Sequence, residues 1–322
     1  MIDIKLILTQ PEKGKELLAL KGCDADLGRI AELDERRRAL ITKGDELKKQ
    51  RNEASALVPK LKKEGKDVSE IIARTKQTGA EIAETDKLIA ETEKELTDAV
   101  AVLPNLPDED LKGGGKENNE VVKVFGEKPT FDGFTPLGHV ELCRRHGLID
   151  YERGVKLSGS GHWIYRGKGA QLEWALLNFF VSEHLKDGYE FILPPLALGY
   201  NCGFGSGQFP KFKDEVYWVE DAEASDRTKM KFMLPTAETA LVNLYSGEML
   251  KESELPKKLF AYTPCFRKEA GSYRSEERGM IRGHQFNKVE MVQITTPEQS
   301  DAAFEELVGK ACSLVSKLGL HF

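Results

Sequence analysis

Two long heptad repeats in the first third of the chain constrain its fold more than any other feature. From residue 27 to residue 61 the apolar side chains fall on alternating steps of three and four, which is the seam of a coiled coil. These are Ile30, Leu33, Leu40, Leu47, Ala54, Val58 and Leu61. After a break at Gly65 and a new helix start near Ser69, a second repeat places Ile82, Ile89, Leu96 and Leu103 seven residues apart. The pattern predicts two antiparallel helices joined as a hairpin.

The seam of this hairpin is imperfect, and the chain changes character after it. Polar residues or glycine take seam positions at Arg37, Gly44, Arg51, Thr75, Thr78, Thr85 and Thr92. We therefore expect thin packing between the helices. The second helix should stop before residues 104–107 (PNLP), and residues 113–119 (GGGKENN) are typical of a flexible linker. We predict a helical-arm domain at 1–110 and a second domain at 111–322.

Positive charge is concentrated in the first helix of the hairpin. The net charge of the whole chain is −6, which argues against a protein that coats nucleic acid over its entire surface. Residues 36–66 nevertheless hold eleven basic residues against four acidic ones, a local charge of +7. Taken alone, this pattern favours an oligomerisation coiled coil with a solvated face. A surface that contacts phosphates is the alternative.

Several classes of protein are disfavoured by the sequence. No apolar run approaches the roughly 18 residues of a membrane span, and residues 1–9 lack the pattern of a secretory signal, so we expect a cytoplasmic protein with no membrane partner. The five cysteines form no C-x-x-C pair and the six histidines no H-x-x-x-H pair. Neither a disulfide framework nor a metal-ligating residue is predicted.

Beyond the linker, residues 125–322 mix short β-rich runs with helical ones, which predicts an α+β domain. No G-x-x-x-x-G-K-[ST] occurs. The glycine-rich pieces 159–161 (GSG) and 205–207 (GSG) do not lie in a strand-to-helix G-x-G-x-x-G context. A nucleotide site in this chain would therefore be neither a P-loop nor a Rossmann site.

Residues 262–269 and 280–290 are expected to form a strand, a long loop and a returning strand. Alternation along the strands predicts one face that collects Arg267, Glu269, Arg282, His284, Phe286, Lys288 and Glu290. Cross-strand ion pairs on a solvated face would explain the charges. They explain less well why an aromatic ring lies among them.

These residues carry a resemblance to a known family. Residues 266–269 (FRKE) and 281–286 (IRGHQF) resemble motif 2 of class II aminoacyl-tRNA synthetases, in the form found in seryl-tRNA synthetases. Residues 234–238 (LPTAE) resemble the serine-binding T-A-E segment, and 205–212 (GSGQFPKF) resemble the G-T-G-Q-L-P-K-F stretch. Residues 169–195 resemble motif 1, and the hairpin occupies the place of the tRNA-binding arm. The resemblance thus implies an N-terminal coiled-coil arm followed by a class II antiparallel-sheet catalytic domain.

The same resemblance implies an activity. Serine and ATP would give seryl-adenylate and pyrophosphate, and the seryl group would pass to tRNA(Ser), with Mg²⁺ as cofactor and a homodimer formed through motif 1. It implies that Arg267 holds the α-phosphate and Arg282 the outer phosphates, as the catalytic residues. Other implied nucleotide-binding residues are Glu269 at the adenine end, Phe286 stacked on adenine, and Gly283.

Two further sets of contacts follow from the resemblance. Serine would be held by Thr236, Ala237, Glu238 and Glu290, although T-A-E alone also fits a helix start capped by threonine. The implied contacts to tRNA are Arg36, Arg37, Lys48, Lys49 and Arg51.

The chain also departs from the family pattern. It ends before a motif 3 helix and before the usual Mg²⁺ carboxylate, so the resemblance implies a C-terminally incomplete catalytic domain that makes little seryl-adenylate by itself. Gly283 replaces a frequent valine, and Ser275, Glu276 and Glu277 make the motif 2 loop acidic. A synthetase-like tRNA-binding or regulatory protein without catalytic activity is the alternative. A paralogue that charges a carrier protein is disfavoured, because it would have little use for a basic arm.

Overall fold

The computed structural model describes residues 4–108, 110–219, 229–269 and 279–322. The chain forms two compact units, Met1–Glu120 and Val121–Phe322. The domain boundary expected between residues 110 and 111 falls in the irregular chain before this division and stays a prediction. The acidic loop residues 275–277 lie outside the described residues.

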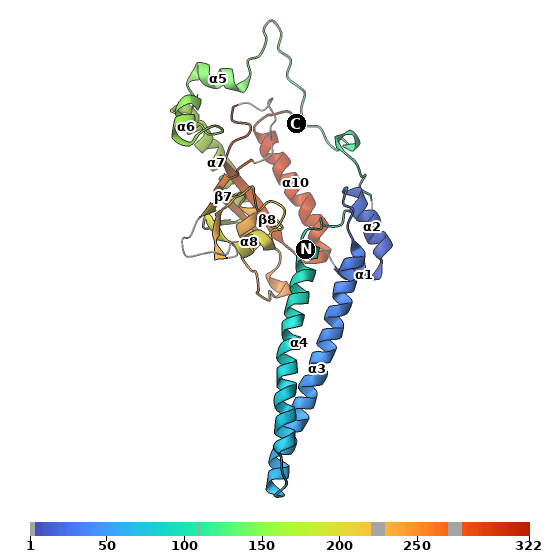
Figure 1. The fold of residues 1–322 in the computed structure, drawn as a ribbon. Helices are drawn as coiled ribbons and strands as arrows, with labels where there is room; N and C mark the ends of the chain where they lie inside the picture. Colours follow the sequence, from blue (N-terminus) through green and yellow to red (C-terminus); the bar gives the residue numbers. More distant parts are fainter. Residues whose placement is uncertain (1–3, 109, 220–228, 270–278) are drawn as a thin grey trace. The chain divides into compact units, whose positions relative to one another are not determined.

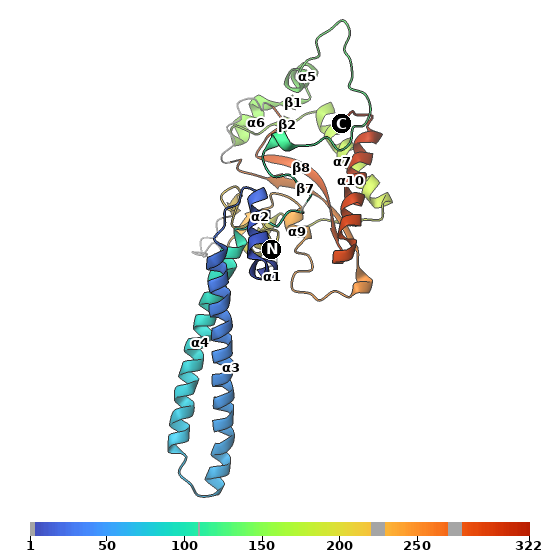
Figure 2. The same ribbon diagram turned by 90° about the vertical axis from the view of Figure 1, so that its right-hand side faces the viewer.

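The first unit is a helical hairpin on a short helical base. Its elements are α1 (Ile4–Thr9), α2 (Pro11–Leu20), α3 (Leu27–Lys63), α4 (Ser69–Ala101) and the 3₁₀ turn η1 (Lys116–Asn118). The helices α3 and α4 lie side by side and run antiparallel (Figures 1 and 2), as the heptads predicted. The side chain of Asp26 caps α3 by accepting from the backbone N–H of Arg29 at 3.1 Å.

Apolar packing in this unit is concentrated where α3 begins and α4 ends, which we call the base of the arm. The buried cluster there consists of Ile7, Leu18, Ile30, Leu33, Leu96 and Val100. Farther along the seam, Gly44 and Thr85 are buried, and Thr92 is fully buried with its hydroxyl donating to the carbonyl of Leu88 at 2.8 Å. The seam is therefore as polar and thin as expected.

The described residues of the second unit form three small sheets. The largest has the order β3 (Glu190–Ile192), β7 (Lys257–Phe266) and β8 (Gln285–Ile294). The other sheets are β4 (Ala197–Gly199), β6 (Lys231–Met233) and β5 (Trp218–Val219), and the pair β1 (Ile149–Asp150) and β2 (Ile164–Tyr165). All pairings are antiparallel except that of β3 with β7, which is parallel. The chain between those two strands is long enough for the crossover that a parallel pair requires.

The helices of this unit are α5 (His139–His146), α6 (Tyr151–Ser158), α7 (Lys168–Lys186), α8 (Tyr200–Gly205), α9 (Glu238–Leu241) and α10 (Ser300–Lys317), with 3₁₀ turns η3 (Glu252–Glu254) and η4 (Pro297–Gln299). The expected α+β arrangement is confirmed. No helix in the described part of the chain has both the length and the apolar character needed to cross a bilayer.

The β7–β8 pair has two different faces. Its register sets Thr263 opposite Lys288 and Ala261 opposite Glu290, so these side chains share one face. On the other face Asn287 donates to Glu173 of α7 at 3.0 Å, and Lys258 pairs with Glu306 of α10 at 2.8 Å. Helices α7 and α10 cover that second face (Figure 2), whereas α9 packs on part of the first face, beside Leu259 and Ala261.

Candidate active site

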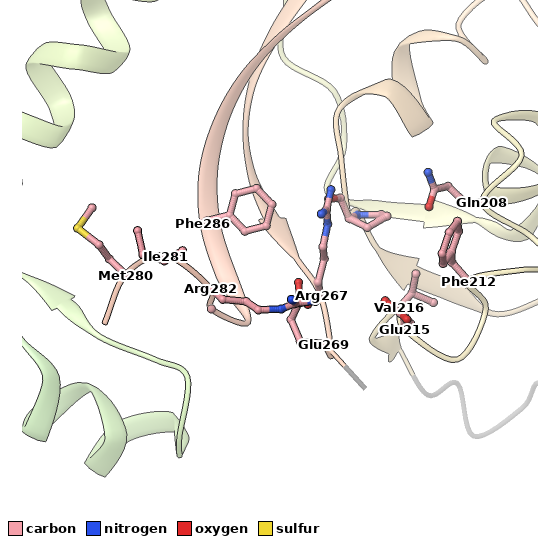
Figure 3. Close-up of a pocket in the computed structure, with 12 residues that line it drawn as sticks. Gln208, Phe212, Glu215, Val216, Arg267, Glu269, Met280, Ile281, Arg282 and Phe286 are labelled. Carbon is pink, nitrogen blue, oxygen red and sulfur yellow. The ribbon is translucent and has the colours of Figure 1, made fainter. Parts of the chain in front are cut away.

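A cavity of about 530 Å³ opens at the ends of β7 and β8 (Figure 3). This is within the usual size range of small-molecule sites. Charged side chains and aromatic rings line it together: Gln208, Phe212, Glu215, Val216, Pro235, Arg267, Glu269, Met280, Ile281, Arg282, Gly283 and Phe286. All five residues predicted to hold a nucleotide are in this lining.

Arg267 follows β7 directly and is held in place from two sides. Its Nε donates to the carbonyl oxygen of Pro235 at 3.1 Å. Its guanidinium carbon lies 5.1 Å from the ring centroid of Phe286 on β8. A planar cation is thus fixed beside an aromatic face at the wall of the cavity.

Arg282 and Glu269 form the second charged feature of the cavity. Both Nε and a terminal nitrogen of Arg282 lie 2.7 Å from Oε2 of Glu269. Glu269 has a φ of +50°, which is uncommon for a residue other than glycine and is often found at functional sites. The two side chains predicted to hold opposite ends of a nucleotide therefore meet in one ion pair.

A compact polar cluster adjoins the cavity, with Glu290 at its centre. Oε2 of Glu290 accepts from the hydroxyl of Thr236 at 2.6 Å and from the backbone N–H of Glu238 at 2.9 Å. Lys288 donates to Oγ1 of Thr236 at 2.6 Å and to Oε1 of Glu290 at 2.9 Å. Thr236, Glu238 and Glu290, which were predicted from separate parts of the sequence, are therefore brought together, and the buried Ala237 lies between the first two.

Two observations on this cluster could not be read from the sequence. The hydroxyl of Thr236 bonds Glu290, and α9 begins without a side-chain cap, so the geometry does not match a simple capped helix start. Lys288 was not singled out as a site residue, although strand alternation placed it on the right face. Its contacts with both Thr236 and Glu290 make it a member of the cluster.

The acidic groups of the cluster influence each other. Burial raises the pKa of the Glu238 carboxyl, and the nearby charge of Glu290 raises it further, while Lys288 acts in the opposite direction. The cluster thus combines two carboxylates with one ammonium group. Such a site suits a small ligand that brings its own positive charge.

The predicted arm residues fall into two groups. Arg37 lies 3.6 Å from Glu93 of α4, and Lys48 lies 2.9 Å from Asp86, so both side chains bridge the two helices. Arg36, Lys49 and Arg51, all within the described part of α3, take part in no ion pair. Only this second group is unengaged by acidic residues of the arm.

The described side chains do not fit a metal ion held by the protein. Across residues 4–108, 110–219, 229–269 and 279–322, no three His, Cys, Asp or Glu side chains gather as a metal site. The Mg²⁺ expected from the resemblance thus finds no ligand set among them.

Comparison with known proteins first places the sheet and cavity in a class. Residues 217–322 match the tRNA synthetase class II core domain (G, H, P, S and T), and residues 1–107 match the seryl-tRNA synthetase N-terminal domain. The fold and site therefore define a class II aminoacyl-tRNA synthetase.

Similarity over the whole chain specifies the family. The chain is 55% identical over 323 residues to serine–tRNA ligase 2 of Clostridium acetobutylicum, covering 100% of this chain and 75% of that protein. It is 39% identical over 324 residues to the serine–tRNA ligase of Geobacter sulfurreducens, with the same coverage. The structure of seryl-tRNA synthetase from Pyrococcus horikoshii complexed with ATP superposes with a TM-score of 0.84 at 26% identity, covering 100% of this chain and 75% of that one. The chain belongs to the seryl-tRNA synthetase family.

Proposed function

We propose that this chain provides the ATP- and serine-binding residues for the formation of seryl-adenylate and for transfer of the seryl group to tRNA(Ser). One observation carries this proposal: Pro235, whose carbonyl holds Arg267 at the cavity, directly precedes Thr236, whose hydroxyl bonds Glu290 in the polar cluster. A phosphate-binding cation and an ammonium-binding cluster therefore meet across one peptide unit. A carboxylate of a bound amino acid needs such proximity to attack a phosphate.

The cavity residues suit a nucleotide. In this proposal Arg267 neutralises the α-phosphate, where negative charge develops during attack, and Arg282 holds the outer phosphates. Phe286 offers a ring face to adenine, and Glu269 accepts from its amino group. Because Arg282 pairs with Glu269, bound ATP must share or replace that contact.

The polar cluster suits serine. The carboxylates of Glu238 and Glu290 accept from the serine ammonium and hydroxyl, and Thr236 fixes Glu290 in position. A site that pairs its buried acceptors with a ligand hydroxyl rejects an analogue lacking that hydroxyl by about 10⁴-fold or more. Alanine is therefore the competitor that this cluster excludes.

The proposal extends to partners. We propose that the basic arm contacts tRNA phosphates and that a homodimer forms through the motif 1 segment, residues 169–195. Exposed apolar side chains support the second point, since Leu172 is 64%, Trp174 56% and Leu193 71% exposed. Because charged tRNA is consumed by translation, we also propose a cytoplasmic location.

The test is serine-dependent ATP–pyrophosphate exchange by the intact protein, with ATP binding measured in parallel. Glu290→Ala should abolish most exchange with serine while leaving ATP affinity within about twofold, whereas Arg267→Ala should lower exchange by about 10²-fold or more and weaken ATP binding. Glu290→Ala exchanging at the parent rate would contradict the serine assignment. Absence of exchange in the parent protein, with tRNA binding retained, would instead favour a tRNA-binding protein without catalysis.

A further inference from the structure

A segment outside the family motifs packs against residues 282–284, the stretch of chain that carries Arg282. Residues 161–163, between α6 and β2, lie along residues 282–284, which lead into β8. The backbone N–H of His284 donates to the carbonyl of Gly161 at 3.1 Å, and the rings of His162 and His284 lie 5.0 Å apart. The chain entering β8 is therefore bonded to this segment on one side.

The other side of residues 282–284 is bonded to Arg267, directly after β7. The backbone N–H of Arg267 donates to the carbonyl of His284 at 2.9 Å, and Nδ1 of His284 lies 3.1 Å from the carbonyl of Arg267. His284 thus links the segment 161–163 to the arginine that we assign to the α-phosphate. Movement of the segment would reach both arginines of the cavity.

Close packing at three glycines holds residues 161–163 tightly between α6 and residues 282–284. A Cβ added at Gly283 would overlap the six-membered ring of Trp163, and one added at Gly161 would lie 2.6 Å from the ring of His284. Behind the segment, a Cβ at Gly154 of α6 would overlap the backbone of residues 162 and 163. Helix α6, residues 161–163 and residues 282–284 are therefore packed together with no room for a methyl group at any of these contacts.

We propose that Trp163 is a positioning residue of the nucleotide cavity, which acts by seating its ring on Gly283 and so fixing Arg282. The inference rests on the proposed ATP site. Trp163 is not part of the cavity lining, so it acts through Gly283 rather than by touching the ligand. Glycine has more backbone freedom than any other residue type, so the backbone at Gly283 would otherwise be mobile. The rigid ring of Trp163 against Gly283 restricts that backbone and thereby limits the orientations of the neighbouring Arg282. Phosphate contacts that are fixed before binding lose less entropy when ATP binds.

The test compares single and double variants of the intact protein by ATP–pyrophosphate exchange. Gly283→Ala should raise KM for ATP about tenfold, because the new methyl displaces the Trp163 ring, with KM for serine changed less than about twofold. Trp163→Ala should raise KM for ATP by about fivefold to tenfold, because the contact between the Trp163 ring and Gly283 is lost. In the double variant the methyl occupies space that the ring has left, so KM should stay close to that of either single variant.

The double variant separates this mechanism from a direct effect on the ligand. If the methyl of Gly283→Ala acted by touching ATP directly, it would raise KM for ATP by the same factor with or without the Trp163 ring. The effects of the two substitutions would then multiply, and the double variant would show a KM for ATP raised about 50-fold to 100-fold. That multiplicative result, or an unchanged KM for ATP in Gly283→Ala, would overturn the inference. Trp163→Phe, a smaller change that should preserve folding, is expected to raise KM for ATP severalfold. An unchanged KM for ATP in this variant would count against the inference even if Gly283→Ala failed to fold.

Two further variants complete the design. Gly309→Ala in α10 is the matched control, since no atom lies within 4 Å of an added Cβ there, and its kinetics should equal those of the parent. Arg282→Ala tests the nucleotide site itself. If it leaves ATP unaffected, the proposed ATP site is wrong. If it weakens ATP use while the variants at residues 163 and 283 do not, only the positioning role of Trp163 fails.

Discussion

Nζ of Lys288 lies 2.6 Å from Oγ1 of Thr236, and this contact joins the middle of β8 to the chain two residues before α9. The same ammonium group lies 2.9 Å from Glu290. The hydroxyl of Thr236 therefore accepts from Lys288 while it donates to Glu290. Lys288 therefore fixes the direction of that hydroxyl.

The first prediction concerns this lysine. Lys288→Met should raise KM for serine by about tenfold to hundredfold, because a charge-assisted hydrogen bond to each of two site residues is lost, while KM for ATP changes little. Lys288→Arg should recover part of the loss. Steady-state pyrophosphate exchange at varied serine gives both values.

Lys258 supplies the matched control for that experiment. It also pairs with a glutamate, and its side chain is 31% exposed against 29% for Lys288, but it lies on the opposite face of the sheet. Lys258→Met should lower the melting temperature and leave KM for serine unchanged. Equal effects of the two substitutions on KM would show that Lys288 acts only on stability.

The second prediction separates the two groups of basic residues on α3. Reversal of Arg36, Lys49 and Arg51 to Glu should weaken tRNA binding and reduce its salt dependence by about one unit of slope per lost phosphate contact. Reversal of Arg37 and Lys48 should lower the melting temperature of the arm, because each new carboxylate faces Glu93 or Asp86. Since exposed ion pairs contribute only about 0–1 kcal/mol each, that second effect should be modest.

Binding across a salt series and thermal melting check both halves of this prediction. If the triple reversal leaves tRNA affinity and its salt slope unchanged, the unengaged residues of α3 are not the contact surface.

The third prediction follows from Glu238. Its pKa in the folded protein lies above 4.5, mainly because the group is buried and secondarily because Glu290 is near. The folded state therefore holds this proton more tightly than the unfolded chain does, and the free energy of unfolding falls as pH rises from about 4.5 through the folded pKa. Glu238→Gln should thus stabilise the protein at pH 7 and not at pH 4.

Melting temperatures of both proteins across that range provide the measurement. Glu248→Gln, at an exposed residue, serves as the control for the change of glutamate to glutamine. A Glu238→Gln difference that stays constant from pH 4 to pH 7 would contradict the assignment. The same variant should use serine poorly, so that stability and activity change in opposite directions.

The fourth prediction concerns the seam of the arm. Gly44 is buried within α3, and a Cβ there would lie 3.7 Å from Ile89 and Thr85, an ordinary contact distance. Gly44→Ala should raise the free energy of unfolding of the arm by about 1 kcal/mol, because alanine restricts the unfolded chain and favours the helix. Chemical denaturation followed by circular dichroism measures this. A destabilised variant would mean that the seam has no room for the methyl.

The sequence predicted the features that depend on local periodicity. The heptads gave the α3–α4 hairpin, and strand alternation placed Lys288 beside Glu290. Contacts between side chains of different helices or strands were harder to predict. The periodicity of a sequence shows which side chains share a face, but not which residue of a neighbouring element lies opposite each of them. The pairing of Arg37 with Glu93 and of Lys48 with Asp86 was therefore not predicted, because it depends on the register between two helices. In the same way, Gly283 was recognised as a departure from a pattern, but the Trp163 ring that fills the space beside it is 120 residues away in sequence.

The uneven distribution of apolar contacts along the arm has a thermodynamic consequence. The buried cluster lies at its base, whereas Leu57 and Ile72, near the turn between α3 and α4, are 48% and 47% exposed. The cost of local opening should therefore decrease steadily toward that turn, so that backbone amides there exchange with solvent faster than those beside Ile30 and Val100. The far end of the hairpin can then bend to follow an RNA surface while the base remains folded.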